Sequence, residues 1–466
     1  MILIINSAVF PVVVAAQSFH PLQLDATAAI LVEQTTGRVL YAYNAHERRY
    51  PASMSKMITA LVVMEYLEID DVVTVGVEIN AMPPGYATNI HAVGETISVH
   101  MLLKALMIRS GNETGRTLAL EVVRRTTGNS DITYNQAKPM FSNMMNAKAR
   151  SLGVQDTNFN NPYGLHAAQH FTTAYDLALV ARAFMDNPVL AEIVGIHTFE
   201  GDSLGGIYYP DGNVREYSWT NTNRLLPGAD FGHPHMQGIK TGFTTPAGHC
   251  FAGAAYHNGL GLVTIVFDSP DPGRWQDTRR LMDFGFANFS FREIAWAEQV
   301  LETIYIENPR RGDPDTLEIL STAGYRSLLS HAEYEAVTRV ITYDPLLVAI
   351  DYEAENEKIR LFAPLEAGEV VGMVEYIVNG EVIFYAPIAA ARDVYERTFD
   401  SDMDYYIALF FDNIFTTRAL PYWFGAIGTI FGIFGMSMAI TVSRRARKFE
   451  RWQPTERRRV SRYDRR

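Results

Sequence analysis

The sequence predicts an α+β protein: an antiparallel sheet packed against a cluster of helices, then a small all-β domain and a transmembrane helix near the C-terminus. Strand-like apolar runs lie at both ends of residues 25–290, with helical patterns between them. Residues 296–392 change to short strands and turns. Residues 419–443 carry no charged side chain. The 466 residues, 48% of them hydrophobic, are enough for two or three folded units.

Apolar spacing defines the expected elements of the first region. Gln34–Gly37 separates two apolar runs and predicts a hairpin, and His257–Gly259 predicts a second turn. The expected strands are Thr27–Val32, Val39–Tyr43, His249–Tyr256 and Leu260–Phe267. The expected helices are Lys56–Tyr66, Val99–Met107, Thr117–Arg125 and Thr278–Asn288.

The second region has the pattern of a separate β domain. Asn379-Gly380 is a typical two-residue hairpin turn. We therefore divide the body into residues 21–292 and 296–392. The clearest expected strands of the second part are Leu346–Tyr352, Ile359–Leu361, Gly372–Val378 and Val382–Ala386.

Both ends of the chain have the character of membrane-directed segments. Residues 1–20 resemble a secretory signal without its basic start, and a buried N-terminal strand is the alternative. Residues 400–421 form an amphipathic stretch before an apolar segment, 422–442, which is long enough to span a bilayer. Residues 443–466 form a basic tail, which the positive-inside rule assigns to the cytoplasm. A buried core helix is the alternative for residues 422–442.

Charge and cysteine content exclude several classes of function. The formal net charge is −12, although residues 444–466 hold 11 basic and 3 acidic side chains. The acidic body argues against nucleic acid as a partner. A single cysteine, Cys250, excludes an intramolecular disulfide and a thiolate metal cluster. His233-Pro234-His235 fits a loop better than a metal site.

Ser53 and Lys56 form the first of three motifs with catalytic chemistry. They lie three residues apart at the start of an expected helix, so both side chains share a face. A serine needs a base to become a nucleophile, and a lysine can serve if burial or a nearby positive charge lowers its pKa. A helix N-terminus also directs N–H groups at a developing oxyanion. The pattern alone is common and also fits an ordinary helix start.

The second motif is Ser110-Gly111-Asn112, in a break between two expected helices. The hydroxyl of Ser110 can relay a proton, and the side-chain amide of Asn112 can hold a substrate carbonyl. The third motif is Lys240-Thr241-Gly242, followed by Phe243 and lying just before the strand 249–256. A strand edge with a glycine admits an extended peptide, and a lysine with a hydroxyl suits a carboxylate. Taken singly, each tripeptide also fits a plain turn.

The order and spacing of the three motifs resemble the serine D-alanyl-D-alanine carboxypeptidases, which are low-molecular-mass penicillin-binding proteins of the DD-peptidase/β-lactamase superfamily. The resemblance extends over residues 21–392 and implies a DD-peptidase fold for residues 21–292. The matching blocks are Pro51–Thr59, Met144–Leu152, Asn158–Leu165, Thr172–Leu177, Gly238–Gly242, Ala247–Cys250 and Ala363–Gly372.

The resemblance implies a role for each matching residue. Ser53 would be the acylated nucleophile, Lys56 its general base and Ser110 a proton shuttle. Asn112 would bind substrate and orient Lys56. Lys240, Thr241, Gly242 and Phe243 would bind the substrate, and the first two would hold its terminal carboxylate. The N–H groups of Ser53 and Phe243 would form the oxyanion hole. Arg274 resembles an arginine that helps bind the carboxylate, and a surface arginine is the alternative.

The resemblance further implies a bacterial enzyme that removes the terminal D-Ala from peptidoglycan stem peptides ending in D-Ala-D-Ala. β-Lactams would acylate Ser53, and no metal or other cofactor would be needed. The C-terminal helix would contact membrane lipid as a single-pass anchor, with the catalytic domain extracytoplasmic and the tail in the cytoplasm.

Three alternatives share this chemistry. A DD-endopeptidase would use the same groups on crosslinked peptides. A class A β-lactamase needs an E-x-x-L-N motif, which does not occur between Asn112 and Lys240. A β-lactam sensor would acylate without turnover, and is expected to have membrane helices before its ligand domain and a cytoplasmic output domain.

Overall fold

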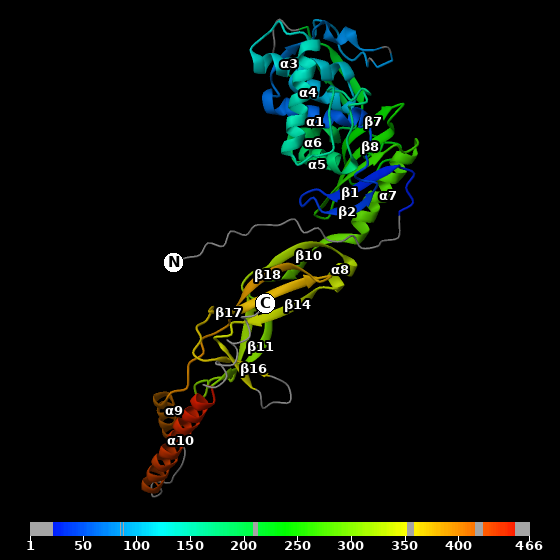
Figure 1. Cartoon of the computed structure of the whole chain (residues 1–466). Coiled ribbons are helices and arrows are strands. Elements are labelled where there is room, and N and C mark those ends of the chain that lie inside the picture. The colour runs from blue at the N-terminus through cyan, green and yellow to red at the C-terminus, as the bar shows by residue number, and fades with distance from the viewer. Residues whose placement is uncertain are drawn as a thin grey trace, which may run out of the picture. The chain divides into compact units, whose positions relative to one another are not determined.

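The computed structural model describes residues 22–83, 85–86, 88–207, 213–351, 358–414 and 423–452 (Figure 1). The chain divides into two compact units. The first runs to Phe291 and includes Leu328–Ala332; the second comprises Arg292–Ser327 and the chain from Glu333 onward. The signal-like segment expected at residues 1–20 lies outside the described residues.

An antiparallel sheet forms the centre of the first unit. In spatial order its strands are β2 (Val39–Tyr43), β1 (Ala28–Glu33), β9 (Leu260–Phe267), β8 (Gly248–His257) and β7 (Met236–Thr244). The expected mixture of an antiparallel sheet and helices is therefore present. Lys240-Thr241-Gly242, which we expected just before a strand, lies within edge strand β7 itself. Glycines at 238 and 242 interrupt the apolar run there, which hides the strand in the sequence.

Helices cover both faces of this sheet (Figure 1). Along β1, Ala28, Ile30 and Val32 belong to the core shared with the helical cluster. Ala29 and Leu31 point the opposite way, into the core beneath α7 (Gly273–Asn288). Because both faces are covered, all six residues of β1 are buried. The cluster contains α1 (Lys56–Tyr66), α2 (Val99–Ile108), α3 (Asn112–Thr127), α4 (Tyr134–Ser151), α5 (Ala174–Met185) and α6 (Pro188–Gly195).

Short elements complete the first unit. A 3-10 turn, η1 (Ala52–Ser55), leads directly into α1. A second 3-10 turn, η2 (Val77–Ala81), lies between α1 and α2. Two small hairpins lie outside the main sheet. They are β3 (Val72–Thr74) with β4 (Thr96–Ser98), and β5 (Thr198–Asp202) with β6 (Glu216–Thr220). Helices α4, α5 and α6 and both of these small hairpins were not predicted.

The second unit is built on a seven-stranded sheet, in keeping with the expected β domain. Asn379 and Gly380 form the predicted turn of its longest hairpin, with φ of 52° and 85°. In spatial order the strands are β14 (Thr338–Tyr343), β17 (Val370–Val378), β18 (Glu381–Ala390), β12 (Thr316–Ser321), β11 (Val300–Glu307), β16 (Lys358–Phe362) and β15 (Val348–Asp351). Three further elements, β10 (Phe289–Ala295), β13 (Tyr325–Ser330) and α8 (His331–Glu335), each have residues in both units.

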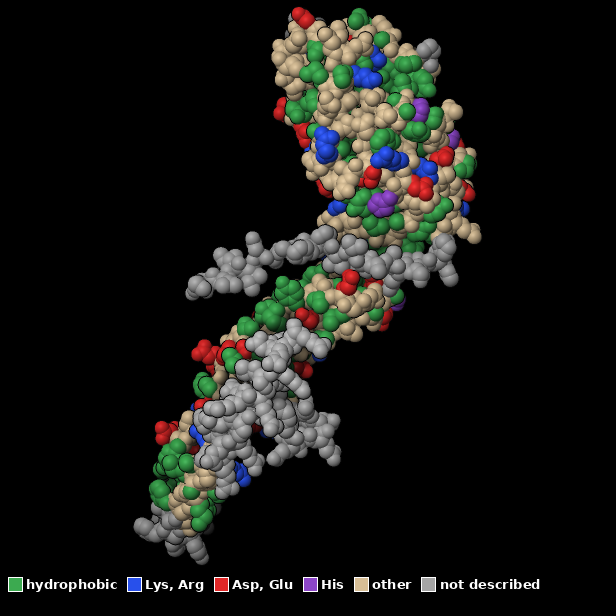
Figure 2. Space-filling view, viewed as in Figure 1, with side chains coloured by type: hydrophobic (Ala, Val, Ile, Leu, Met, Phe, Trp, Pro, Cys, Tyr) green, Lys and Arg blue, Asp and Glu red, His purple; other side chains and the backbone are tan. Residues whose placement is uncertain are grey.

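Two helices follow the β domain. Phe434 of α10 (Trp423–Trp452) contacts Phe399 of α9 (Phe399–Ile414), with ring centroids 4.9 Å apart. Hydrophobic side chains gather on the visible surface of both helices (Figure 2). In the part of the chain that the structure describes, no helix is long and apolar enough to span a membrane. The transmembrane segment expected at residues 422–442 begins at a residue outside the described ranges.

Asp277 fastens the first strand to the closing helix. Its carboxylate, fully buried on α7, accepts backbone N–H bonds from Asp25 at 3.1 Å and Ala26 at 2.9 Å, just before β1. It also accepts from the Ser269 hydroxyl at 2.8 Å and pairs with Arg280 at 3.1 Å. This one carboxylate therefore satisfies donors from three separate segments.

We predict that Asp277→Ala lowers the free energy of unfolding by about 3 kcal/mol, because it leaves the buried donors of Ala26 and Ser269 without an acceptor. Asp283→Ala, on the same helix, removes a carboxylate that is 62% exposed and should cost less than about 1 kcal/mol. Urea unfolding of the full chain, followed by circular dichroism, compares the two. Equal losses would contradict this role of Asp277.

Candidate active site

The backbone around Ser53 forms a tight, preorganised turn. Ser53 lies in η1 with a partly exposed side chain, and Ala52 before it has a left-handed φ of 46°. This conformation is unfavourable for a residue with a Cβ. Two glycines allow other backbone to pack against the turn: a Cβ on Gly164 would lie 1.9 Å from the Ala52 oxygen, and one on Gly242 would lie 3.1 Å from the Pro51 oxygen.

Lys56 places its amine beside the Ser53 hydroxyl. The side chain is fully buried, and Nζ lies 2.8 Å from Ser53 Oγ, 2.7 Å from Asn112 Oδ1 and 2.8 Å from the Tyr163 carbonyl oxygen. Burial, followed by the positive charge of Lys240, holds the pKa of Lys56 well below its usual range, and Glu113 opposes this shift.

The three contacts decide how a neutral amine is oriented. Asn112 Oδ1 and the Tyr163 carbonyl can only accept hydrogen bonds, so they take the two protons of neutral Lys56. The lone pair of Nζ then faces Ser53 Oγ, whose hydroxyl can donate to it. This is the geometry that a general base needs.

The orientation of the Asn112 amide is itself fixed. Asn112 is the first residue of α3, and its Nδ2 donates to the Tyr86 carbonyl at 2.7 Å. Its backbone N–H donates to the Thr88 hydroxyl at 3.3 Å. Because Nδ2 is held by Tyr86, Oδ1 must be the atom that faces Lys56. Nδ2 retains a second proton for a ligand.

A buried carboxylate beside Asn112 holds the segment that carries these partners. Glu113 accepts from the Thr88 hydroxyl at 2.6 Å and from the Ile90 N–H at 2.8 Å. Burial alone would raise the pKa of Glu113, but these hydrogen bonds outweigh it and lower the pKa. The segment that contacts Asn112 is thereby anchored to the helix that begins with Asn112.

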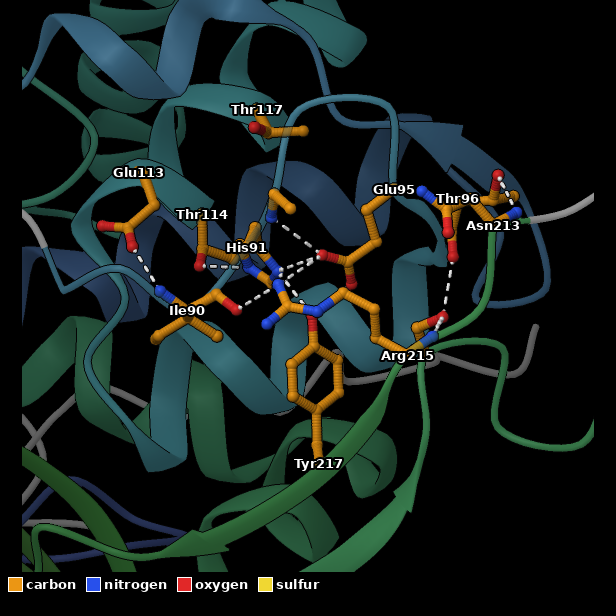
Figure 3. A network of polar contacts seen from close by, with 12 residues as sticks. Ile90, His91, Glu95, Thr96, Glu113, Thr114, Thr117, Asn213, Arg215 and Tyr217 are labelled. Atoms are coloured by element: carbon orange, nitrogen blue, oxygen red, sulfur yellow. Dashed lines mark hydrogen bonds and ion pairs between the residues drawn. The ribbon is translucent and has the colours of Figure 1, made fainter.

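A second buried carboxylate extends this anchoring to β6 (Figure 3). Glu95 is hydrogen-bonded to the Tyr217 hydroxyl and pairs with Arg215 at 3.2 Å. His91 bridges the Tyr217 hydroxyl at 3.1 Å and the hydroxyl of Thr114 at 2.8 Å. Burial alone would raise the pKa of Glu95, but the hydrogen bonds from its partners outweigh burial, so the pKa lies below its usual value. The two carboxylates thus tie residues 88–95 to both α3 and β6.

Ser110 lies in the break between α2 and α3, two residues before Asn112 and with a left-handed φ of 60°. Its side chain is partly exposed, whereas Gly111 is buried. The break was predicted, but the left-handed backbone was not, because serine carries no sequence signal for it.

Strand β7 contributes the second cation. Lys240 is 1% exposed, and its Nζ lies 3.4 Å from Thr241 Oγ1, which in turn lies 2.8 Å from the Thr222 hydroxyl. Burial, and then the charge of Arg274, lowers the pKa of Lys240 to about 7. Phe243 is 55% exposed and stacks on His249 at 4.4 Å. The edge strand therefore offers a lysine, a hydroxyl and an exposed aromatic ring.

Arg274 lies near the start of α7. Its guanidinium sits 4.3 Å from the Trp275 ring, and its Nε is 3.7 Å from Asp271 Oδ1. Its charge lowers the pKa of both Lys240 and His249, although burial is the larger cause in each case. Its Nε is buried without a hydrogen-bond partner. Arg274 thus adds positive charge to the surroundings of Lys240, where an anionic ligand would be stabilised.

Several residues that complete the site carry no motif. Asn161 Oδ1 accepts from the N–H groups of Gly164 at 2.8 Å and Leu165 at 3.0 Å, which shapes the turn that presents the Tyr163 carbonyl. This turn falls in the block 158–165, but a carbonyl acceptor leaves no trace in a sequence. Glu113 and Thr222 were likewise missed, since each acts through a contact with a distant segment.

The chain is similar in sequence to known proteins. A family profile described as D-alanyl-D-alanine carboxypeptidase matches residues 15–271, and one for the C-terminal domain of penicillin-binding protein 5 matches residues 313–396. The D-alanyl-D-alanine carboxypeptidase DacF of Bacillus subtilis is 26% identical over 80% of this chain and 87% of its own length. DacC of Escherichia coli is 28% identical over 83% of this chain and 88% of its own.

Solved structures show the same fold. Penicillin-binding protein 5 of Haemophilus influenzae is 24% identical, has a TM-score of 0.55, and covers 81% of this chain and 100% of its own. A point mutant of the Streptomyces K15 DD-transpeptidase is 27% identical with a TM-score of 0.51, over 57% of this chain and 98% of its own.

We predict that Gly164→Ala destabilises the protein far more than Gly153→Ala. Both glycines have nearly the same left-handed φ, 86° and 87°, so an alanine costs about 1–2 kcal/mol of backbone strain at either position. Only at position 164 does the new Cβ also overlap the Ala52 carbonyl; at position 153 its nearest neighbour is 3.9 Å away. Urea unfolding of both variants measures the difference in the free energy of unfolding. Equal losses would show that the turn at Ala52 can move away from the new Cβ without loss of stability.

Proposed function

The chain belongs to the D-alanyl-D-alanine carboxypeptidase family, and from this premise we propose that Ser53 is the nucleophile with which it removes the terminal D-Ala from peptidoglycan stem peptides. The enzyme is a serine D-alanyl-D-alanine carboxypeptidase. The observation that carries the assignment of the nucleophile is the buried amine of Lys56, 2.8 Å from Ser53 Oγ.

In the acylation step, neutral Lys56 takes the proton of Ser53 as Oγ attacks the carbonyl carbon of the penultimate D-Ala. The N–H groups of Ser53 and Phe243 stabilise the oxyanion that forms. The peptide C–N bond then breaks, and the leaving amine of the terminal D-Ala receives a proton that passes from Lys56 through Ser110. The products of this step are free D-Ala and an ester on Ser53.

Deacylation reverses these roles. A water molecule gives its proton to Lys56 while its oxygen attacks the ester carbonyl, and the same N–H groups stabilise the second oxyanion. The C–O bond breaks, and Ser53 Oγ regains a proton. A β-lactam ring would follow the same acylation step, and its tethered leaving group would remain attached.

Substrate recognition rests on charge and on the edge strand. Lys240 and Thr241 would bind the terminal carboxylate, with Arg274 adding charge nearby. The free proton of Asn112 Nδ2 would donate to a substrate carbonyl. Gly242 leaves room for an extended peptide beside β7, and the exposed ring of Phe243 would contact it.

We further propose the domain organisation and location of the chain. Residues 21–292 would form the catalytic domain and 296–392 the β domain, outside the bacterial cell membrane. Residues 400–421 would lie at the membrane surface, 422–442 would cross it, and 443–466 would lie in the cytoplasm. The uncharged stretch 419–443 with the basic residues after it supports this arrangement.

The direct experiment measures D-Ala release from diacetyl-Lys-D-Ala-D-Ala by the full chain, beside Ser53→Ala. We expect release by the unsubstituted enzyme and none by the variant. Release by the variant would contradict Ser53 as the nucleophile. No release, with stable labelling of Ser53 by penicillin, would favour an endopeptidase or a sensor, and rapid turnover of penicillin would favour a β-lactamase.

The two lysines predict the shape of the pH profile of kcat/KM. Lys56 must lose its proton to act as a base, so activity rises with pH through its lowered pKa. Lys240 must keep its proton to bind a carboxylate, so activity falls as pH rises through about 7. In Lys240→Arg the charge persists, and the alkaline limb should move up by more than one pH unit while the acid limb stays. An unchanged alkaline limb would contradict the role of Lys240.

A further inference from the structure

Behind the nucleophile turn lies a buried polar pair that the mechanism above does not use. Ser55, fully buried, has its Oγ 2.7 Å from Nε2 of His170, which is 1% exposed. Ser55 Oγ also lies 2.9 Å from the carbonyl oxygen of Ala52. His170 belongs to a loop more than 100 residues further along the chain, so the contact is a feature of the fold.

The protons of this pair can be placed from their partners. His170 Nδ1 accepts the backbone N–H of Asn160 at 2.9 Å, so Nδ1 carries no proton. In the neutral ring the proton is therefore on Nε2, which donates to Ser55 Oγ. Ser55 in turn must donate to the Ala52 carbonyl, which can only accept. The result is a series of hydrogen bonds that all donate in one direction, from Asn160 through His170 and Ser55 to Ala52.

These hydrogen bonds end at the Ala52 carbonyl and thereby fix the direction of the Ser53 N–H. The Ala52 carbonyl and the Ser53 N–H belong to one planar peptide unit and point in opposite directions. Holding the oxygen therefore aims the N–H, which is a donor of the proposed oxyanion hole. Gly164 packs against the same unit, since a Cβ there would lie 2.8 Å from Ser53 N. The left-handed φ of Ala52 makes the unit dependent on such support.

We propose that Ser55 and His170 are positioning residues that hold the Ala52–Ser53 peptide so that its N–H points at the developing oxyanion. This inference rests on the proposed function of Ser53. The pair orients a donor that binds more strongly in the transition state than in the ground state. Its loss therefore affects the chemical step and leaves substrate binding largely intact.

A proton relay through His170 does not fit the site. Both ring nitrogens are engaged, one by a backbone N–H and the other by Ser55. Burial, and to a smaller extent the charges of His166 and Lys138, lowers the pKa of His170 to about 3, so the ring stays neutral at the pH of any ordinary assay. His170 thus acts as a fixed donor.

The test compares Ser55→Ala with Ser203→Ala. Ser203 is equally buried and its hydroxyl also donates to a backbone carbonyl, that of Thr96 at 2.8 Å, but it lies between β5 and β6. We measure kcat and KM for D-Ala release, the rate constant of acylation by a fluorescent penicillin, and the melting temperature. Ser55→Ala should lower kcat and the acylation rate about 10- to 100-fold with KM within threefold. Ser203→Ala should keep both rates and lose a similar amount of stability.

A second set of variants tests the link to His170. If His170 acts through Ser55, then Ser55→Ala/His170→Ala should have the same kcat as Ser55→Ala alone. Ser55→Thr, which keeps the hydroxyl, should recover most of the lost acylation rate. A double variant with a lower kcat than Ser55→Ala alone would overturn the proposed link between His170 and Ser55. Wild-type rates in Ser55→Ala would overturn the whole proposal.

The outcomes also separate this inference from the proposed function. An unsubstituted enzyme that neither releases D-Ala nor reacts with penicillin would overturn both. An active unsubstituted enzyme with unchanged rates in Ser55→Ala would overturn the positioning role alone.

Discussion

Burial of the Lys56 amine governs the rest of the active site. A charged ammonium in a dry interior costs several kcal/mol unless it is paired, and the three groups that contact this one are uncharged: a hydroxyl, an amide and a backbone carbonyl. The neutral form is therefore favoured, and its lone pair has one direction left, toward Ser53. The nearby charge of Lys240 acts in the same sense. The low pKa of Lys56 and its proposed role as a base thus have a single structural origin.

Keeping that amine in place requires support from distant parts of the chain. Asn161 shapes the turn that offers the Tyr163 carbonyl, and Glu113 holds the segment that orients the amide of Asn112. Edge strand β7 brings Lys240 to the same place from the sheet. The helical cluster and the sheet therefore each supply half of the site. In the proposed mechanism, a substrate that lies along the edge strand would meet Ser53, Lys56 and Lys240 together.

The sequence was sufficient to predict the motif residues but not the contacts that make them work. Ser53 and Lys56 could be paired because helical spacing is local, and the hairpin at Asn379-Gly380 because its turn chemistry is local. Tyr163 and Glu113 act through partners 23 to 107 residues away, so no periodicity reveals them. Lys240 was placed before a strand, because glycines conceal the apolar pattern of β7. His170 belongs to none of the three motifs, and its contact with Ser55 emerges from the fold alone.

The protonation state of Lys56 tests this account most directly. The chain has seven lysines, so NMR titration of the full protein with labelled lysine side chains resolves them, and Lys56→Arg assigns the signal. The account predicts an amine that titrates well below the usual lysine range. It also predicts that Lys240→Met moves this pKa upward, because one neighbouring positive charge is gone. A Lys56 that stays protonated up to about pH 10 would contradict the central claim.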